Sequence, residues 1–409
     1  MTKRPIINSL LETDQYKVNM QQVVLHQFST DTVTWAFKCR NKNVRFTPEM
    51  IDEIRTQIDL FCTLRFTPDE LAWLGKTLPW LTKDYLDFLS DWRPHRGDIL
   101  VNEGGVTPDG DCGLAIEAHG TWLRTMMYEI PILAIVSEVY YAFEYGLDDM
   151  GRGALDMDFK TRARQKLQAI KDGTYDIGAF SEFGLRRRYS GEMQDWLIGL
   201  MVAHKTPGFV GTSNLYLARK YGIKPVGTMA HEFIMVSGQG HPEHNPAYSN
   251  FYALRAWNRE YGTQNGIALT DTLGTDIFLR DFDQNFATLF SGVRHDSGNP
   301  ILWGEKMIAH YKSLGIDPAA KTLLFSDSLD FARATEIKRY FDGKAKVAFG
   351  IGTYLSNDTK AEPLNIVMKV IEANGVPAAK LSDCAGKGMC RDTSYVDYLR
   401  RTIDWRLAH

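Results

Sequence analysis

Short apolar runs that stop at a small, charged or aromatic residue recur through the second half of this chain. The run ends that can be placed are Phe183, Gly211, Thr228, Asp271, Arg294, Asp327 and Thr353. A strand, loop and helix together take about 30 residues or more, and most steps between these ends have that order of length. The step from Gly211 to Thr228 is too short for a full unit. The pattern therefore favours an α/β chain with a closed, irregular (β/α) barrel over one with an open sheet.

A barrel of this kind also predicts where the chemistry lies. In (β/α) barrels the reactive groups sit at the C-terminal ends of the strands, where the loops converge. Here the runs end in Thr, Asp, Arg, Gly or an aromatic residue, which are groups that a polar ligand needs. We therefore expect one site, built from residues far apart in the sequence.

The chain divides into three parts on these patterns. Residues 1–145 are expected to form an N-terminal α/β domain, with a strand at Thr32–Cys39, short strands within 96–120 and helical spacing from 121 to 144. Residues 146–360 are expected to form the barrel. Residues 361–409 contain a hairpin around Asn374-Gly375 and a terminal amphipathic helix, both expected to pack back on the N-terminal domain.

Composition narrows the class of protein. The formal charge of −3 and hydrophobic content of 44% indicate a globular chain without the basic surface that nucleic acid or an anionic membrane requires. Five scattered cysteines, never spaced C-x-x-C, favour a reducing compartment. The N-terminus lacks the apolar core of a signal peptide, and the apolar stretch 130–143 is interrupted by Ser137 and Glu138. These features predict a cytoplasmic protein.

Two strand ends carry groups suited to a phosphorylated sugar. In the segment 348–353, Gly350 and Gly352 leave backbone N–H groups open to a phosphate, and Thr353 adds a hydroxyl. In the segment 293–298, Arg294 offers a planar fork to a carboxylate or phosphate, and Asp296 can accept from ribose hydroxyls. Taken alone, the first segment is equally a bare turn, and the second a salt-bridged strand terminus.

A histidine and an aromatic–arginine segment add further chemistry. His231 follows the strand that ends near Thr228 and can act as base, ligand or phosphoryl acceptor, with Asp271 holding its other ring nitrogen. Phe183 can stack on a flat heteroaromatic ring while Arg186 meets a phosphate. The alternatives are a structural histidine and a core phenylalanine beside a solvated basic face. Near the N-terminus, Tyr16 lies in a helix start that Thr13 is expected to cap.

Taken together, these segments resemble the nicotinate phosphoribosyltransferase family, bacterial type, over essentially the whole chain. The matching segments occur in the family's order: TDQYK, FGLRRR, FVGTSN, GTMAHE, ALTDT, VRHDSG, FSDSLD and FGIGT. The resemblance implies a type II phosphoribosyltransferase fold, which is an N-terminal α/β domain plus an irregular barrel, in a homodimer with shared active sites.

The resemblance also implies roles for individual residues. His231 would be the transiently phosphorylated histidine and Asp271 its orienting partner. Tyr16 from the other subunit and Phe183 would sandwich the pyridine ring. The remaining implied contacts are Thr228 and Arg294 to nicotinate, Gly350, Gly352 and Thr353 to the phosphoribosyl phosphate, Asp296 to the ribose hydroxyls, and Arg186 to the phosphate side. Mg²⁺ is implied by the pyrophosphate leaving group, although the sequence contains no dedicated set of metal ligands.

Three positions depart from the family or bear on its substrate. Asn299 stands where the bacterial type usually has Asp, and Leu185 replaces a common Thr. The related nicotinamide enzymes carry Asp at the position of Ser213, where a carboxylate would repel that of nicotinate. Ser213 therefore favours nicotinate, whereas Asn299 looks more like the nicotinamide type.

The resemblance implies a reaction. Nicotinate and 5-phosphoribosyl 1-diphosphate would give nicotinate mononucleotide and pyrophosphate, while ATP is hydrolysed to ADP and phosphate through phosphohistidine, as a salvage step of NAD biosynthesis. Nicotinamide, or less readily quinolinate, remains an alternative base. A barrel lyase with a Schiff-base lysine is disfavoured because no lysine stands at the predicted strand ends, and a non-catalytic nucleotide-binding regulator is a further alternative.

Overall fold

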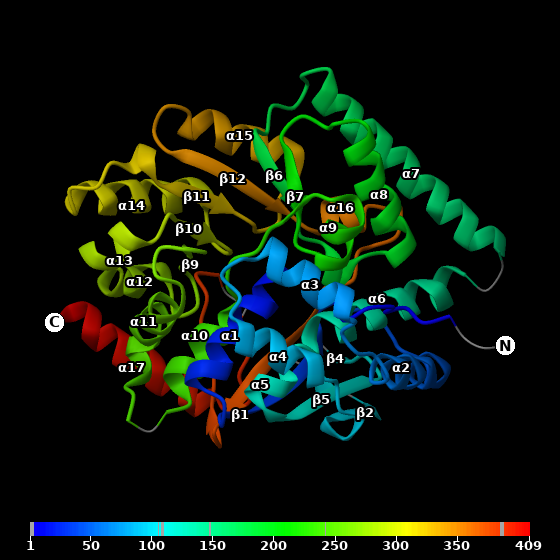
Figure 1. The fold of residues 1–409 in the computed structure, drawn as a ribbon, viewed down its shortest axis with the longest axis horizontal. Coiled ribbons are helices and arrows are strands. Elements are labelled where there is room, and N and C mark those ends of the chain that lie inside the picture. The colour runs from blue at the N-terminus through cyan, green and yellow to red at the C-terminus, as the bar shows by residue number, and fades with distance from the viewer. Residues whose placement is uncertain (1–3, 105, 108–109, 147–148, 242, 385–387) are drawn as a thin grey trace.

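Two β-sheets organise the computed structural model, which describes residues 4–409 apart from 105, 108–109, 147–148, 242 and 385–387 (Figure 1). A five-stranded sheet has the order β14-β13-β1-β5-β2, and a seven-stranded sheet has the order β8-β7-β6-β12-β11-β10-β9. The strands of the five-stranded sheet are β1 Thr32–Cys39, β2 Ile99–Glu103, β5 Leu114–Thr121, β13 Ile366–Ala373 and β14 Val376–Pro377. The strands of the seven-stranded sheet are β6 Ala179–Glu182, β7 Phe209–Thr212, β8 Lys224–Pro225, β9 Ile267–Leu269, β10 Gly292–His295, β11 Thr322–Phe325 and β12 Lys346–Ile351. A separate pair is formed by β3 Val106–Thr107 and β4 Gly110–Asp111.

The seven-stranded sheet is the predicted barrel. All its neighbouring strands pair in parallel, and each strand contains or shortly precedes one of the seven predicted run ends. The predicted α/β fold class is thus confirmed, with one correction. Within the described residues no backbone pairing joins β8 to β9, so the sheet is a curled half-barrel and not the closed barrel that we predicted.

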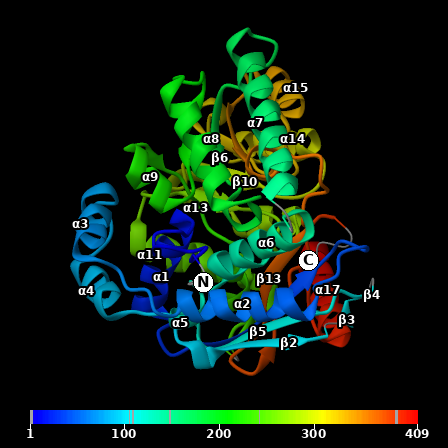
Figure 2. The ribbon, with the colours of Figure 1, turned by 90° about the vertical axis from the view of Figure 1, so that its right-hand side faces the viewer.

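Helices cover the outer face of the half-barrel and pack around the five-stranded sheet (Figures 1 and 2). On the N-terminal side they are α1 Gln15–Gln27, α2 Pro48–Phe61, α3 Pro68–Thr77, α4 Lys83–Asp91, α5 Trp122–Thr125 and α6 Glu129–Tyr145. Around the half-barrel they are α7 Asp149–Lys171, α8 Gly191–Ala203, α9 Leu215–Tyr221, α10 His231–Gln239, α11 Ser249–Tyr261, α12 Thr275–Asp281, α13 Gln284–Leu289, α14 Pro300–Ser313, α15 Phe331–Phe341, α16 Thr353–Ser356 and the terminal α17 Thr393–Ala408. Short 3₁₀ turns are η1 Arg96–Asp98, η2 Leu185–Arg187, η3 Pro246–Tyr248 and η4 Pro318–Ala320.

Local sequence explains several of these helix boundaries. Thr67 and Glu70 form a reciprocal capping box at the start of α3. The side chain of Asn214 accepts from two backbone N–H groups of α9, which ends at Gly222 in the left-handed conformation. The predicted Thr13 cap of α1 is wrong: the residue before the first turn is Asp14, and its side chain makes no capping bond. That carboxylate is bonded elsewhere, in the site described below.

The C-terminal hairpin and the terminal helix pack against different parts of the molecule. The hairpin β13–β14 pairs with β1, which places it in the N-terminal sheet as predicted. The terminal helix was expected on the same domain, and this is wrong, because α17 packs on α12 and η3 beside the half-barrel. A small apolar cluster joins them through Leu273, Ile277, Leu399 and Ile403. The domain boundaries at 145 and 360 remain predictions.

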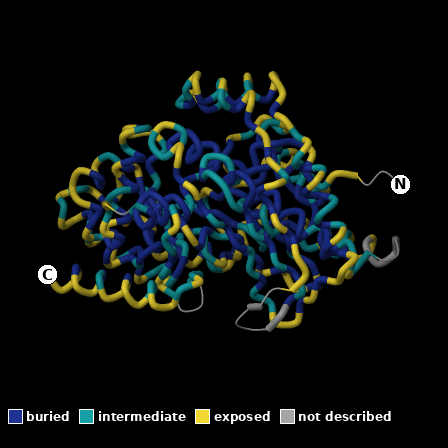
Figure 3. Tube along the Cα trace, turned by 90° about the horizontal axis from the view of Figure 1, so that it is seen from below, coloured by how far each residue is buried: buried dark blue, intermediate teal, exposed yellow. Residues whose placement is uncertain are grey.

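One large core joins the two sheets, and buried positions fill the interior in Figure 3. The segment Trp122–Tyr145, which contains α5 and α6, is long and apolar enough to cross a membrane by composition alone. However, 78% of its most apolar window is buried inside the protein, which is typical of a central core helix. Its helix α6 contacts β13 of the five-stranded sheet, the helix α2, and the turn η2 that follows β6 of the seven-stranded sheet. It therefore lies between the two sheets.

Candidate active site

A pocket of about 530 Å³ opens at the carboxyl ends of the parallel strands. Ten of the twelve predicted site residues line it: Tyr16, Phe183, Arg186, Ser213, Thr228, His231, Arg294, Asp296, Gly352 and Thr353. The other two, Asp271 and Gly350, lie directly behind lining residues. The prediction that distant strand ends converge on one cavity is therefore confirmed, while the role of each residue remains a prediction.

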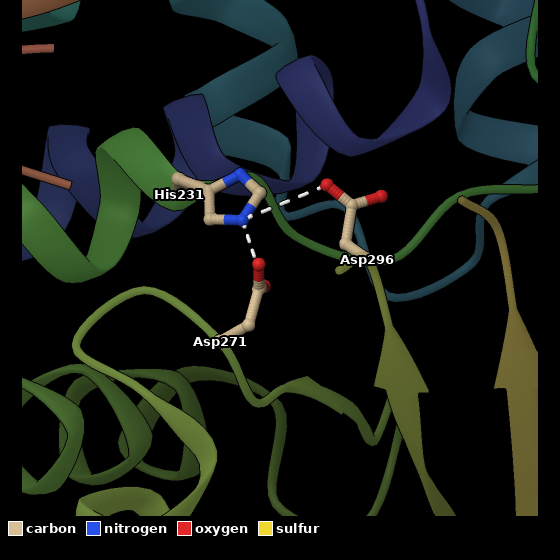
Figure 4. A group of neighbouring side chains, drawn as sticks. All are labelled: His231, Asp271 and Asp296. Carbon is tan, nitrogen blue, oxygen red and sulfur yellow. Dashed lines mark hydrogen bonds and ion pairs between the residues drawn. The ribbon is translucent and has the colours of Figure 1, made fainter. Parts of the chain in front are cut away.

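His231 is the first residue of α10 and projects towards two carboxylates (Figure 4). Its Nε2 lies 2.9 Å from Oδ1 of Asp271 and 3.6 Å from Oδ2 of Asp296. Asp271 is itself fixed, because it accepts from Ser297 Oγ at 2.6 Å and pairs with Lys380 Nζ at 3.0 Å. With Nε2 held on Asp271, the ring orientation is set and Nδ1 is left to face a reactant.

Burial, more than the nearby charges, keeps the ring of His231 neutral. Burial and the nearby Lys380 ammonium lower its pKa to about 4, and together they outweigh the opposing effect of Asp271 and Asp296. A neutral imidazole that donates Nε2–H to Asp271 has a free lone pair on Nδ1. Burial opposes ionisation of Asp296, yet Arg294, His231 and Lys380 hold the pKa of that carboxyl well below its usual range. The site thus combines a neutral imidazole with ionised carboxylates.

His231, Asp271 and Asp296 lie close enough to share one metal ion, with their ligand atoms within 4.8 Å of one another. The fit to Mg²⁺ is poor, because Mg²⁺ prefers six oxygens and both oxygens of Asp271 are already bonded. Asp296 and Asp327 both line the pocket just after the paired strands β10 and β11.

Arg294 is hydrogen-bonded to side chains that follow three different strands of the half-barrel. Its guanidinium donates to Ser326 Oγ at 2.8 Å, to Thr228 Oγ1 at 3.0 Å and to Asp296 Oδ1 at 3.0 Å. These partners follow β11, β8 and β10, so a single side chain spans the strand ends. With a further bond from Nη1 to the backbone oxygen of Met229 at 3.3 Å, four of its five N–H groups are engaged, so the guanidinium is held in one orientation at the pocket wall.

Phe183 and Tyr16 line the pocket as aromatic walls. Phe183 depends on Gly350, because a Cβ at that position would lie 2.3 Å from two ring carbons of Phe183. Gly350 thus makes room for the ring and does not itself line the cavity. Gly352 and Thr353 do line it, which leaves them as the phosphate-facing part of that predicted segment.

The N-terminal segment inserts into the half-barrel of its own chain. Asp14 pairs with Asn214 in an antiparallel bridge, and Ser213 Oγ donates to Asp14 Oδ1 at 2.6 Å. Burial raises the pKa of Asp14, against the effect of the Ser213 hydrogen bond and Arg186. Tyr16 and Phe183 of the same chain therefore line one pocket, and a contribution of Tyr16 to the site of another subunit stays a prediction.

Four cations in the pocket were missed by the sequence analysis: Arg40 and Arg187, and the lysines Lys369 and Lys380. Burial, followed by the charges of Arg186 and Arg40, lowers the pKa of Arg187 to about 9, and similar causes hold the pKa of Lys369 well below its usual range. Such mutual repulsion indicates a site prepared for an anion with several charges. Lys369 lies on β13, and Arg40 and Lys380 follow β1 and β14, so strand-end reasoning about the barrel could not find these three.

Two departures from the family pattern have structural explanations. Asn299 is exposed and caps α14, accepting from the backbone N–H groups of Ile301 and Leu302. An Asn caps a helix as well as an Asp does. Leu185 is fully buried in the core, where its apolar side chain packs and does not face the pocket.

Comparison with known proteins gives one family over nearly the whole length. Residues 11–137 match the nicotinate phosphoribosyltransferase (NAPRTase) N-terminal domain, and residues 179–406 match the nicotinate phosphoribosyltransferase (NAPRTase) family. A nicotinate phosphoribosyltransferase from Cupriavidus necator is 45% identical over 396 residues, which cover 97% of this chain and 98% of that protein.

Solved structures agree with the sequence comparison. The crystal structure of a nicotinate phosphoribosyltransferase from Vibrio cholerae matches 99% of this chain and 95% of its own, with a TM-score of 0.89 at 34% identity. The enzyme from Porphyromonas gingivalis matches 98% of this chain and 100% of its own, with a TM-score of 0.86 at 34% identity. The fold, the assembled pocket and these matches together show that the chain belongs to the nicotinate phosphoribosyltransferase family.

Proposed function

We propose that this protein forms nicotinate mononucleotide and pyrophosphate from nicotinate and 5-phosphoribosyl 1-diphosphate, and that it couples this transfer to ATP through phosphorylated His231. The reaction would be a salvage step of NAD biosynthesis, and ATP coupling would class the enzyme as a C–N ligase. One observation carries the proposal: the oriented His231–Asp271 pair lies beside a pocket with aromatic walls and a partly buried cluster of cations.

The pocket suits both substrates of the transfer. Tyr16 and Phe183 provide faces for a planar pyridine ring, and Arg294 with Thr228 provides donors for its carboxylate. The cations missed by the sequence analysis offer positive charge for the diphosphate. As pyrophosphate leaves C1 of the ribose, cationic character develops there, and the nicotinate nitrogen attacks. The protein supplies position and charge stabilisation and needs no covalent step with the sugar.

The ATP-coupled step uses the free nitrogen of His231. Nδ1 attacks the γ-phosphorus of ATP, a P–N bond forms, and ADP leaves. Asp271 stabilises the positive charge of the phosphorylated ring through Nε2–H. Water later breaks the P–N bond, which releases phosphate and restores the neutral imidazole for the next cycle.

Mg²⁺ is proposed as the required ion. When bound with the substrate phosphates, it would neutralise their charge during transfer. Asp296 and Asp327 are the residues that would hold it, because their carboxylates follow adjacent strands at the pocket edge. A homodimer and a cytoplasmic location are also proposed, and both follow from the family resemblance and the composition alone. Light scattering of the purified protein would test the dimer.

The first experiment measures product formation from phosphoribosyl diphosphate with nicotinate, nicotinamide or quinolinate, each with and without Mg-ATP. Nicotinate mononucleotide, formed preferentially and stimulated by ATP, is the expected result. The variant His231→Ala should lose ATP stimulation while retaining slower, ATP-independent transfer. Equal ATP stimulation of wild type and His231→Ala would refute the role of His231. If no base accepts the phosphoribosyl group, the remaining alternative is a non-catalytic nucleotide-binding regulator.

One observation keeps nicotinamide as a second candidate base. Ser213 lacks the carboxylate of the nicotinamide enzymes, yet the structure brings the carboxylate of Asp14 to the same place, 2.6 Å from Ser213 Oγ. A carboxylate there could accept from an amide NH₂. Preference for nicotinamide in the assay above would support this role of Asp14.

A further inference from the structure

Lys17 is a fully buried ammonium in α1, directly after the pocket residue Tyr16. Its Nζ lies 2.7 Å from Oε2 of Glu129 and 2.5 Å from Oε2 of Glu232. It also lies 4.9 Å from the ring centroid of Trp35, on β1. Burial opposes the charged form, but Glu129 and Glu232 raise the pKa of Lys17 above its ordinary value, so the ammonium remains charged.

Both carboxylates belong to segments that carry predicted site residues. Glu232 directly follows His231 in the first turn of α10, and its second oxygen accepts from Trp122 Nε1 at 3.5 Å. Glu129 is the first residue of α6, lines the pocket, and has its other oxygen 3.6 Å from Nη1 of Arg186. Lys17 is therefore the common partner of two segments that are distant in the sequence.

The sharing of Glu129 has an electrostatic consequence. One oxygen of Glu129 pairs with Lys17 and the other faces Arg186, so the two cations compete for a single negative charge. While Lys17 neutralises Glu129, Arg186 remains available to an anion in the pocket. Without Lys17, Glu129 would bind Arg186 more strongly and place an uncompensated negative charge at the pocket wall.

We propose that Lys17 is a positioning residue that acts through Glu129 to keep Arg186 available to the substrate phosphates and through Glu232 to hold the start of the helix that carries His231. The arm through Glu232 rests on the proposed function, since it concerns the phosphorylated histidine. The arm through Glu129 concerns only anion binding.

The experiment for the Glu129 arm measures pyrophosphate binding to the full chain by calorimetry. Lys17→Met keeps the apolar stem and should weaken binding about 10-fold, which is within the usual range of coupling between sites. Glu129→Gln releases Arg186 and should strengthen binding. These opposite directions separate positioning from simple structural damage, which would weaken binding in both variants. Weaker binding in both would overturn this arm.

The experiment for the Glu232 arm measures labelling of His231 from γ-labelled ATP. Glu232→Gln is nearly isosteric and should lower labelling about 10-fold or more, because small displacements of a reacting group are costly. Pyrophosphate should bind this variant at least as tightly as wild type, since Lys17 is then left to Glu129 alone. Unchanged labelling would overturn this arm. If Lys17→Met does not fold, Glu129→Gln and Glu232→Gln still decide both arms.

A matched control is the buried ion pair between Asp281 and Arg406, whose Oδ1 and Nη2 lie 2.8 Å apart between α12 and α17. Neither residue lines the pocket. Asp281→Asn should lower thermal stability but leave pyrophosphate binding and labelling at wild-type values, and the same losses as in Lys17→Met would overturn the proposal. A wild-type protein that binds pyrophosphate but forms no nicotinate mononucleotide would instead refute the proposed function.

Discussion

Substitution of Gly350 by alanine tests how the half-barrel positions its aromatic wall. The new Cβ would lie 2.3 Å from two ring carbons of Phe183, whereas ordinary contact begins at 3.4 Å. The ring must therefore retreat by about 1 Å, and a misplacement of that size in an active site can cost about 100-fold in rate. Overpacking of this kind also destabilises a protein by about 1–3 kcal/mol. We expect a higher KM for nicotinate, a lower kcat and a lower Tm.

The assay compares kcat, KM for nicotinate and Tm of Gly350→Ala with those of Gly304→Ala. Gly304 is a matched control in α14, since a Cβ there would lie 2.3 Å from the ring of the buried Phe341, which does not line the pocket. Gly304→Ala should lose similar stability but keep the wild-type KM. A wild-type KM in Gly350→Ala, or an equal rise in both variants, would refute the reasoning.

Three further predictions follow from the contacts of the site. Ser213→Asp should raise KM for nicotinate at least about tenfold in steady-state assays, because the new carboxylate joins that of Asp14; an unchanged KM would count against it. Burial and, after it, the charge of Lys380 lower the pKa of His231 to about 4, so Lys380→Met should raise that pKa part of the way back. The acid limit of His231 labelling should then move to higher pH, and an unmoved limit would contradict this. Asn299→Ala should cost about 1 kcal/mol in urea unfolding, whereas Asn299→Asp should retain the cap of α14; equal losses would refute this.

Strand ends were the most predictable part of the fold. All the apolar runs but the one that ends at Phe183 stop at a polar or small residue, because parallel strands are buried along their length and solvated only where their loops converge. The short runs gave all seven strands of the half-barrel, and the hairpin around Asn374 was also correct. Closure of the barrel was not predictable in this way, since it depends on whether β8 and β9 meet, and no local pattern encodes that.

The candidate site was predictable where motifs and strand ends coincided, as at His231, Arg294 and Thr353. It was not predictable for Lys369 and Lys380, which reach the pocket from the C-terminal hairpin region. In the sequence they are lysines near ordinary strands, and nothing local separates them from solvated lysines. Only the packing of the two sheets buries them beside Arg186 and His231.

The sequence by itself determined the strands and helices, the candidate reactive residues and the family, because apolar periodicity and motif order are local properties of the chain. Tertiary structure alone decided how those residues are charged and oriented. Asp271 orients His231, Lys17 joins Glu129 to Glu232, and Tyr16 enters the pocket of its own chain, all through contacts between segments distant in the sequence. The energies of such contacts depend on burial and on distances of a few ångströms, which exist only after the two sheets have packed together.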